Sequence, residues 1–204
     1  MIDNNDTIRM KNTAFFPSVP GTVDDVSVGR NTIIRRATVH DADQLAALAY
    51  RTFEEAFGPD NDPDDMACYL TTAFTPEKIA AELKDPAALF LLVVQNDRLQ
   101  GYAKLYAGQA PQNTHLPNLV KLVRLYVNHA SIGHGLGAAL MQTCLDTVHQ
   151  AGYGALWLSV WEKNRRARDF YLKWGFHKIG TDEFVIGQDV QTDWIMARTV
   201  APAL

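Results

Sequence analysis

A glycine-rich turn between an apolar strand and an amphipathic helix constrains this chain more than any other part of its sequence. Val120–Val127 has the apolar character of a strand, the segment GHGLGA occupies Gly133–Ala138, and a helical pattern follows as far as Gln150. Glycines let a backbone approach a ligand closely, and the free N–H groups of a first helical turn bind phosphate. The segment predicts a tight strand-to-helix turn, a phosphate-binding loop, or both.

Two familiar phosphate-binding loops do not fit this segment. The dinucleotide-binding spacing Gly-x-Gly-x-x-Gly differs from that of Gly133, Gly135 and Gly137, and the unit sits late in the chain. A Walker A loop needs Gly-Lys-Ser/Thr after its glycines, and none follows here. Neither a Rossmann unit nor a P-loop is expected.

The remaining chain alternates strand and helix patterns, which is typical of an α/β fold. We expect a mixed central sheet of about seven strands flanked by helices, ending in a hairpin across Gly187. Both strand–helix–strand passages in the C-terminal half are expected to join parallel neighbours. The predicted strands cover residues 33–39, 89–94, 99–106, 120–127, 156–161, 176–186 and 191–198.

Polar residues mark the starts of the first three predicted helices. Asp41, with Gln44 three residues later, resembles a capping box. Asp62-Pro63 and Thr75-Pro76 each place a capping side chain before a proline at the first helical position. These signals predict three short helices before the first hairpin.

Length and composition predict one domain of 204 residues, 47% of them hydrophobic. Residues 1–31 lack a sustained period and are expected to form a loosely ordered extension, with the domain at 32–204. Nineteen Lys and Arg against 23 Asp and Glu give a net charge of −4. That balance argues against a nucleic-acid partner and favours a small cationic one.

The sequence also carries predictions about cellular location, disulfides and metal binding. The longest apolar run, Ala87–Val94, is shorter than the roughly 18 to 20 residues that a membrane helix needs. Asp3 and Asp6 are atypical of a secretory signal, so a cytoplasmic protein is expected. Cys68 and Cys144 have no CxxC spacing, and neither a disulfide framework nor a metal site is predicted.

A second segment extends the pattern of the glycine loop. Asn164 opens a helix in which Ala167, Phe170 and Tyr171 share one stripe, and Gly175-Phe176 ends it. With the glycine loop and the segment WLSVWEKN that ends at Asn164, the chain resembles the GNAT-superfamily N-acetyltransferases over about residues 32–199. Segments 160–164 and 191–196 resemble the bacterial spermine/spermidine acetyltransferases of the PaiA type.

The resemblance implies that acetyl-CoA is the co-substrate and lies in a splay between the two central parallel strands. The residues implied in binding it are Leu125, Tyr126, Val127, Gly133, His134, Gly135, Leu136, Gly137, Ala138 and Asn164. Ile132 departs from the Arg or Gln that the family usually has there. Because the phosphate contacts are chiefly backbone N–H groups, weaker binding and not its loss is expected.

The catalytic roles implied by the resemblance are those of an acid and a base. Tyr171 would face the sulfur, and a phenol with a pKa near 10 can protonate a departing thiolate. Glu162 is the first candidate for the base, with Glu54 and Glu55 behind it. Related chains often carry a carboxylate where this one has Val123, and all three acids have an alternative reading as solvated surface groups.

The acceptor is predicted from charge and from the resemblance of segments 160–164 and 191–196 to polyamine acetyltransferases. Four acids, Asp60, Asp62, Asp64 and Asp65, lie between the first two predicted helices and, in chains of this resemblance, roof the acceptor site. Asp64, Asp65 and Glu55 are the predicted substrate contacts, and the predicted acceptor is a primary amine of spermidine or spermine. Acetylation of a protein N-terminus or lysine, and a non-catalytic acetyl-CoA-binding regulatory module, remain alternatives, as do a monomer and a homodimer.

Overall fold

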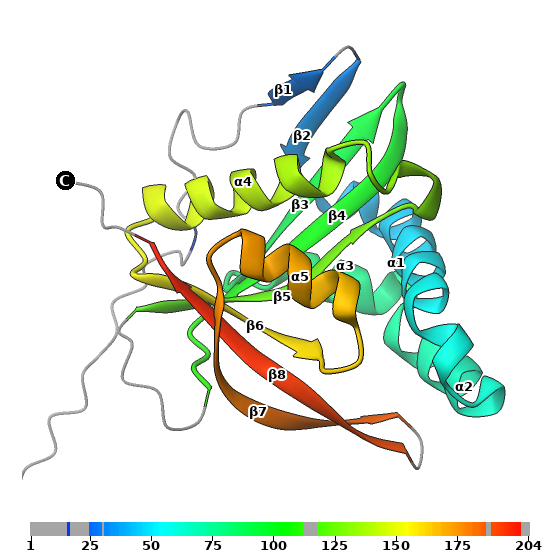
Figure 1. Ribbon diagram of the computed structural model, residues 1–204. Coiled ribbons are helices and arrows are strands. Elements are labelled where there is room, and N and C mark those ends of the chain that lie inside the picture. Colours follow the sequence, from blue (N-terminus) through cyan, green and yellow to red (C-terminus); the bar gives the residue numbers. More distant parts are fainter. Residues whose placement is uncertain (1–15, 17–24, 30, 112–117, 187–188, 201–204) are drawn as a thin grey trace, which may run out of the picture.

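The computed structural model describes residues 16, 25–29, 31–111, 118–186 and 189–200 and places a curved mixed sheet between two layers of helices (Figure 1). The strands lie in the order β1-β2-β3-β4-β5-β6-β8-β7. Their bounds are β1 Val26–Gly29, β2 Thr32–Arg36, β3 Ala88–Gln95, β4 Arg98–Ala107, β5 Leu119–Val127, β6 Ala155–Trp161, β7 His177–Ile186 and β8 Asp189–Thr199. The helices are α1 Ala42–Phe57, α2 Pro63–Ala73, α3 Pro76–Lys84, α4 Leu136–Gln150 and α5 Arg165–Lys173.

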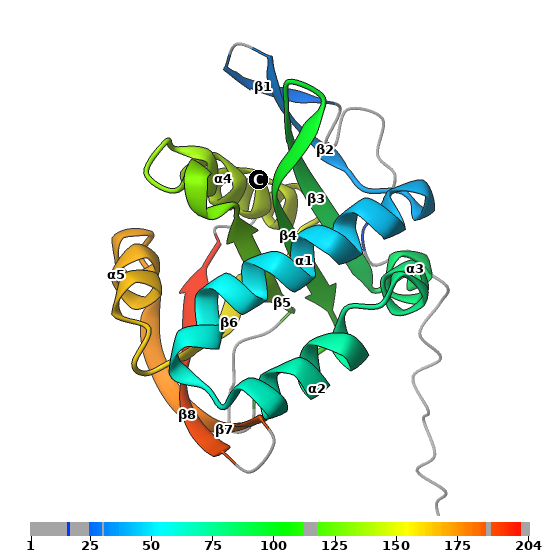
Figure 2. The same ribbon diagram turned by 90° about the vertical axis from the view of Figure 1, so that its right-hand side faces the viewer.

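Alternation along the central strands divides the core between the two faces of the sheet. On β3, Leu89 and Leu91 pack into the cluster that α4 covers, whereas Phe90 and Leu92 pack into the cluster beneath α1 to α3. Figure 2 shows α1 crossing the sheet near β5, with α4 and α5 to one side. The continuous apolar run of β3 therefore belongs to a strand buried on both faces.

The expected α/β architecture is confirmed, with one strand more than predicted. Val26–Gly29 falls inside the segment expected to be an extension, yet it pairs antiparallel with β2. Phe16 from the same segment is also buried, with its ring centroid 5.7 Å from that of Tyr153. Residues before Thr32 thus contribute to the sheet and to the core.

The prediction of two parallel crossovers is half right. β5 and β6 are parallel neighbours, but β6 pairs antiparallel with β8, which separates it from β7. The predicted hairpin explains the difference, because its second strand pairs along the whole of β6, from Ala155 to Trp161. The sequence pattern was enough to predict the direction of each strand. It did not show which strand of the C-terminal hairpin would pair with β6.

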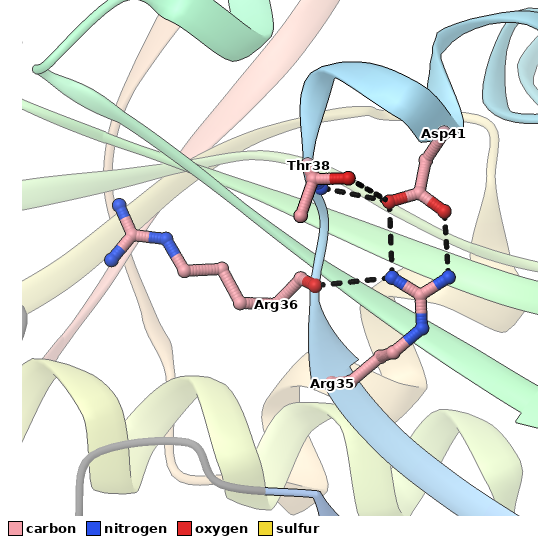
Figure 3. A network of polar contacts seen from close by, with 4 residues as sticks. All are labelled: Arg35, Arg36, Thr38 and Asp41. Atoms are coloured by element: carbon pink, nitrogen blue, oxygen red, sulfur yellow. Dashed lines mark hydrogen bonds and ion pairs between the residues drawn. The ribbon is translucent and has the colours of Figure 1, made fainter. Parts of the chain in front are cut away.

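The predicted capping box at Asp41 and Gln44 is wrong, although the helix starts there. The Asp41 carboxylate accepts two hydrogen bonds from the Arg35 guanidinium, of 2.6 and 3.0 Å, and one of 2.7 Å from the Thr38 N–H (Figure 3). Thr38 and Asp41 make a capping box around the short 3-10 turn Val39–Asp41. The predicted caps Asp62 and Thr75 are confirmed.

A splay opens between β5 and β6. Their parallel pairing covers only residues 119–121 of β5 and 155–157 of β6. Beyond it, β5 carries a bulge at Val123, since Lys104 pairs with Arg124 and Leu105 with Leu122. A bulge bends and twists its strand, so the end of β5 leaves β6 and exposes one backbone edge.

None of the helices in the described ranges is long and apolar enough to cross a membrane.

Candidate active site

A cavity of about 640 Å³ lies at this splay and is large enough for a small-molecule ligand. Three parts of the chain meet there: the end of β5, the connection from β5 into α4, and the connection from β6 into α5. The C-terminal part of α1 closes the cavity. The residues used below that line it are Thr52, Glu55, Asp60, Leu125, Tyr126, Val127, His129, Ser131, Ile132, Gly133, Gly135, Gly137, Ala138, Trp161, Lys163, Asn164, Arg165, Arg166, Phe170 and Tyr171.

The glycine loop forms an open cradle beside the first turn of α4. Gly133 and Gly135 have φ values of +84° and +83°, a region that side chains rarely adopt. A Cβ atom at Gly133, Gly135 or Gly137 would meet no atom within 4 Å. Gly135 caps α4 without a side chain, so no side-chain cap bonds the N–H groups of its first turn. This space, with a positive helix end beside it, fits a pyrophosphate.

Eight of the ten residues predicted to bind the acetyl donor line the cavity, and His134 and Leu136 do not. The His134 ring is exposed, with Nδ1 3.2 Å from the Ile132 carbonyl oxygen. The Leu136 side chain is buried in the core beneath α4. Leu136 therefore anchors the helix, and only its backbone belongs to the loop.

Tyr171 lies in the cavity wall on α5. Its ring centroid is 5.5 Å from that of Phe170 and 5.8 Å from that of Phe176, which fixes the phenol against the core. Among the described residues, the hydroxyl has no hydrogen-bond partner. Burial, and after it the neighbouring Cys144 thiol, raises the pKa of Tyr171 well above its ordinary value. The phenol is therefore protonated at neutral pH and free to donate.

Asn164 is the N-cap of α5. Its Oδ1 accepts a hydrogen bond of 3.0 Å from the Ala167 N–H, which explains the turn from β6 into the helix. The residue also lines the cavity, as do Arg165 and Arg166 on the first turn of α5. Asn164 therefore lies at the site, as predicted, and also caps α5.

The acids predicted for catalysis and substrate binding separate into two groups. Glu55 and Asp60 line the cavity, whereas Glu162, Asp64 and Asp65 do not. The backbone N–H of Glu162 pairs with the Thr192 carbonyl across β6 and β8. Asp62 accepts from the N–H groups of Asp64 and Asp65, which holds both in the first turn of α2.

Several residues of the cavity were not predicted from the sequence. Trp161 could have been found, because the alternation of β6 places it on the face opposite Val160. Thr52 gave no signal: it is buried on α1, and its hydroxyl donates to the Leu48 carbonyl. His129 and Ser131 belong to a 3-10 turn after β5 whose position depends on tertiary contacts.

Residues 43–176 match the family model described as the acetyltransferase (GNAT) family. The chain belongs to this family. It is 36% identical over 158 residues to an uncharacterized N-acetyltransferase of Mycobacterium bovis, covering 78% of this chain and 97% of that protein. It is 30% identical over 160 residues to one of Lactobacillus delbrueckii subsp. lactis, covering 78% and 92%. This GNAT protein is accordingly an acetyltransferase, and acetyl-CoA is its acetyl donor.

Solved structures share the fold. The PaiA N-acetyltransferase of Thermoplasma acidophilum, in complex with coenzyme A, superposes with a TM-score of 0.69 at 21% identity, covering 82% of this chain and 98% of that one. The ribosomal-protein-S18-alanine N-acetyltransferase of Escherichia coli superposes with a TM-score of 0.60 at 19% identity, covering 84% and 96%. The name of the second enzyme gives a ribosomal-protein alanine as its acceptor, and that of the first gives none, so the shared fold does not select an acceptor for this chain.

Within the described ranges, no group of three or more His, Cys, Asp or Glu side chains is arranged to hold a metal ion.

Proposed function

We propose that this GNAT enzyme acetylates a primary amine of a small polyamine such as spermidine or spermine. The observation that carries the proposal is that Glu55 and Asp60 line the same cavity as the glycine loop and Tyr171. Two carboxylates near a transfer site favour a substrate with more than one ammonium group. The net charge of −4 supports the same class.

The proposed donor site uses backbone more than side chains. The open cradle of Gly133, Gly135 and Gly137 would take the pyrophosphate. Arg165 and Arg166 add positive charge to the cavity wall and offset the absence of a charged side chain at Ile132. The free edge of β5 around Tyr126 and Val127 would pair with the pantetheine arm.

The chemistry needs a neutral amine, a polarised carbonyl and a proton for the leaving thiolate. Acetyl-CoA supplies a thioester that an amine can attack. Glu55 takes the place of Glu162 as the proposed base, because it lines the cavity. A backbone N–H near Tyr126 or Val127 polarises the carbonyl oxygen, and the Tyr171 hydroxyl protonates the sulfur.

An acceptor screen tests the proposal directly. Release of free thiol from acetyl-CoA is measured with spermidine, spermine, amino acids, a peptide with a free N-terminus and a lysine peptide. Spermidine and spermine are expected to give the highest kcat/KM. Thiol release with peptides but not with polyamines would discard the polyamine acceptor and favour a protein substrate. No thiol release with any amine, despite acetyl-CoA binding, would favour the regulatory module.

The two groups of acids provide a matched pair of variants. In Glu55→Gln/Asp60→Asn, the KM for spermidine should rise roughly tenfold, as expected for the loss of about 1.4 kcal/mol of binding, and kcat should fall as well because Glu55 is the proposed base. Asp64→Asn/Asp65→Asn makes the same charge change outside the cavity. It should raise the KM for spermidine by a smaller factor, and this rise should disappear at high salt. Equal effects of the two pairs would mean that only the long-range field attracts the substrate.

A further inference from the structure

A hydrogen-bonded network holds the connection that precedes the glycine loop. Asn128 follows β5, and the 3-10 turn that it caps carries His129 and Ser131 into the cavity wall. The Asn128 Nδ2 and the Ser131 hydroxyl both donate to one atom, Oε1 of Gln100, at 2.9 and 3.1 Å. Two donors from the connection thus converge on one side chain of β4.

Backbone and helix contacts complete the network. The Asn128 N–H donates to the Gln100 carbonyl at 2.7 Å, and the Asn128 Oδ1 accepts from Arg51 of α1 at 2.9 Å. The connection is therefore tied to β4 on one side and to α1 on the other. Gln100 itself does not line the cavity, whereas Ser131, whose hydroxyl donates to it, does.

We infer that Gln100 is a positioning residue that sets the affinity for the acetyl donor. The inference rests on the proposed donor site. Leu136 anchors the helix end of the glycine loop in the core, but Gly133 and Gly135, which precede it, have no side chain that could fix the rest of the loop. The connection that Gln100 holds restricts the position of the glycine loop. A binding loop that already occupies one arrangement loses less conformational entropy when its ligand binds.

The expected size of the effect follows from population arithmetic. Apparent affinity falls in proportion to the fraction of protein whose loop is in the binding arrangement. The loss of two hydrogen bonds that hold the connection is expected to lower that fraction about tenfold. The affinity for the acetyl donor is therefore expected to fall about tenfold when Gln100 no longer accepts these hydrogen bonds. The rate of acetyl transfer from the bound donor should change little.

Titration calorimetry with coenzyme A tests this without an acceptor. Gln100→Met should weaken binding about tenfold. Gln142→Met removes a glutamine side chain that donates to Asp146 on the exposed face of α4, and it should bind within about twofold of the unmodified protein. In acetyl transfer, Gln100→Met should raise the KM for acetyl-CoA and leave kcat within about twofold.

Two further variants keep the inference open to refutation. In Asn128→Leu/Ser131→Ala, adding Gln100→Met should change affinity by less than about twofold, because its partners are gone. If Gln100→Met does not fold, Ser131→Ala alone should weaken binding by about threefold. Unchanged affinity in Gln100→Met, or a fall in kcat alone, would refute the inference. Failure of the unmodified protein to bind coenzyme A would refute the donor site and the inference together.

Discussion

Gly101 of β4 lies directly opposite Val127 of β5, and the end of β5 is so close that a side chain does not fit at Gly101. A Cβ atom at Gly101 would lie 2.8 Å from the Tyr126 carbonyl oxygen and 2.8 Å from the Val127 Cγ1. One of these two atoms belongs to the backbone, so it cannot rotate away. The absence of a side chain at Gly101 therefore decides where the end of β5, and with it the cavity wall, can lie.

Gly101→Ala should displace this end of β5. Overpacking of this kind costs about 1–3 kcal/mol of stability, and the affinity for coenzyme A should fall because Tyr126 and Val127 line the cavity. Thermal unfolding and calorimetry measure the two effects. Gly180→Ala is the matched strand control, since its Cβ would lie 3.8 Å from Ile195 in ordinary contact. Equal losses of stability and of coenzyme A affinity in Gly101→Ala and Gly180→Ala would contradict the role given to Gly101.

Gly135→Glu should abolish measurable binding of coenzyme A, because it places bulk and negative charge in the cradle. Gly152→Glu is the control: Gly152 also has a positive φ, of +75°, and open space around its Cβ, but it follows the other end of α4. Both variants carry the same backbone strain, so their unfolding temperatures should fall similarly. Comparable binding by the two would place the phosphate elsewhere.

Tyr171→Phe should keep the affinity for coenzyme A and lower kcat by roughly ten- to ten-thousand-fold, the range for a lost general acid. Because the pKa of Tyr171 is raised, kcat of the unmodified protein should show no loss from its deprotonation below about pH 10. Tyr50→Phe, at a half-buried tyrosine outside the cavity lining, should leave kcat unchanged. Wild-type turnover in Tyr171→Phe would make this ring a packing residue.

Asp193 of β8 should make stability depend on pH. Burial, and after it the charge of Asp182, raises its pKa to about 6, while Lys121 opposes the shift. The folded protein therefore binds this proton more tightly than the unfolded chain, whose aspartate has a pKa near 3.9. The contribution of Asp193 to stability is thus expected to fall as pH rises from about 4 to about 6.

Asp193→Asn should raise the unfolding temperature at pH 7.5 and have little effect at pH 4. Asp182→Asn, which removes only the second cause, should give a smaller rise at pH 7.5. Thermal unfolding of the three proteins at both pH values checks the sign. A lower unfolding temperature for Asp193→Asn at pH 7.5 would show that its carboxylate is stabilised by a partner.

The sequence by itself determined most of the helices and strands and supplied the residues proposed for the donor site. The caps Asp62 and Thr75, the strand β5 and the helix after Gly135 are local features, set by residues a few positions apart. For the same reason the glycine loop and Tyr171 could be named before their positions were known.

Only the tertiary structure decided which acids share the cavity and what holds the loop. Glu162 is close to Tyr171 along the chain but lies outside the cavity lining, whereas Glu55 reaches it from α1. Gln100 contacts Asn128 from 28 positions away, and Gly101 meets Val127 through a strand register. These relations depend on how strands and helices pack, and a local pattern of residue types contains no information about a partner that distant in sequence.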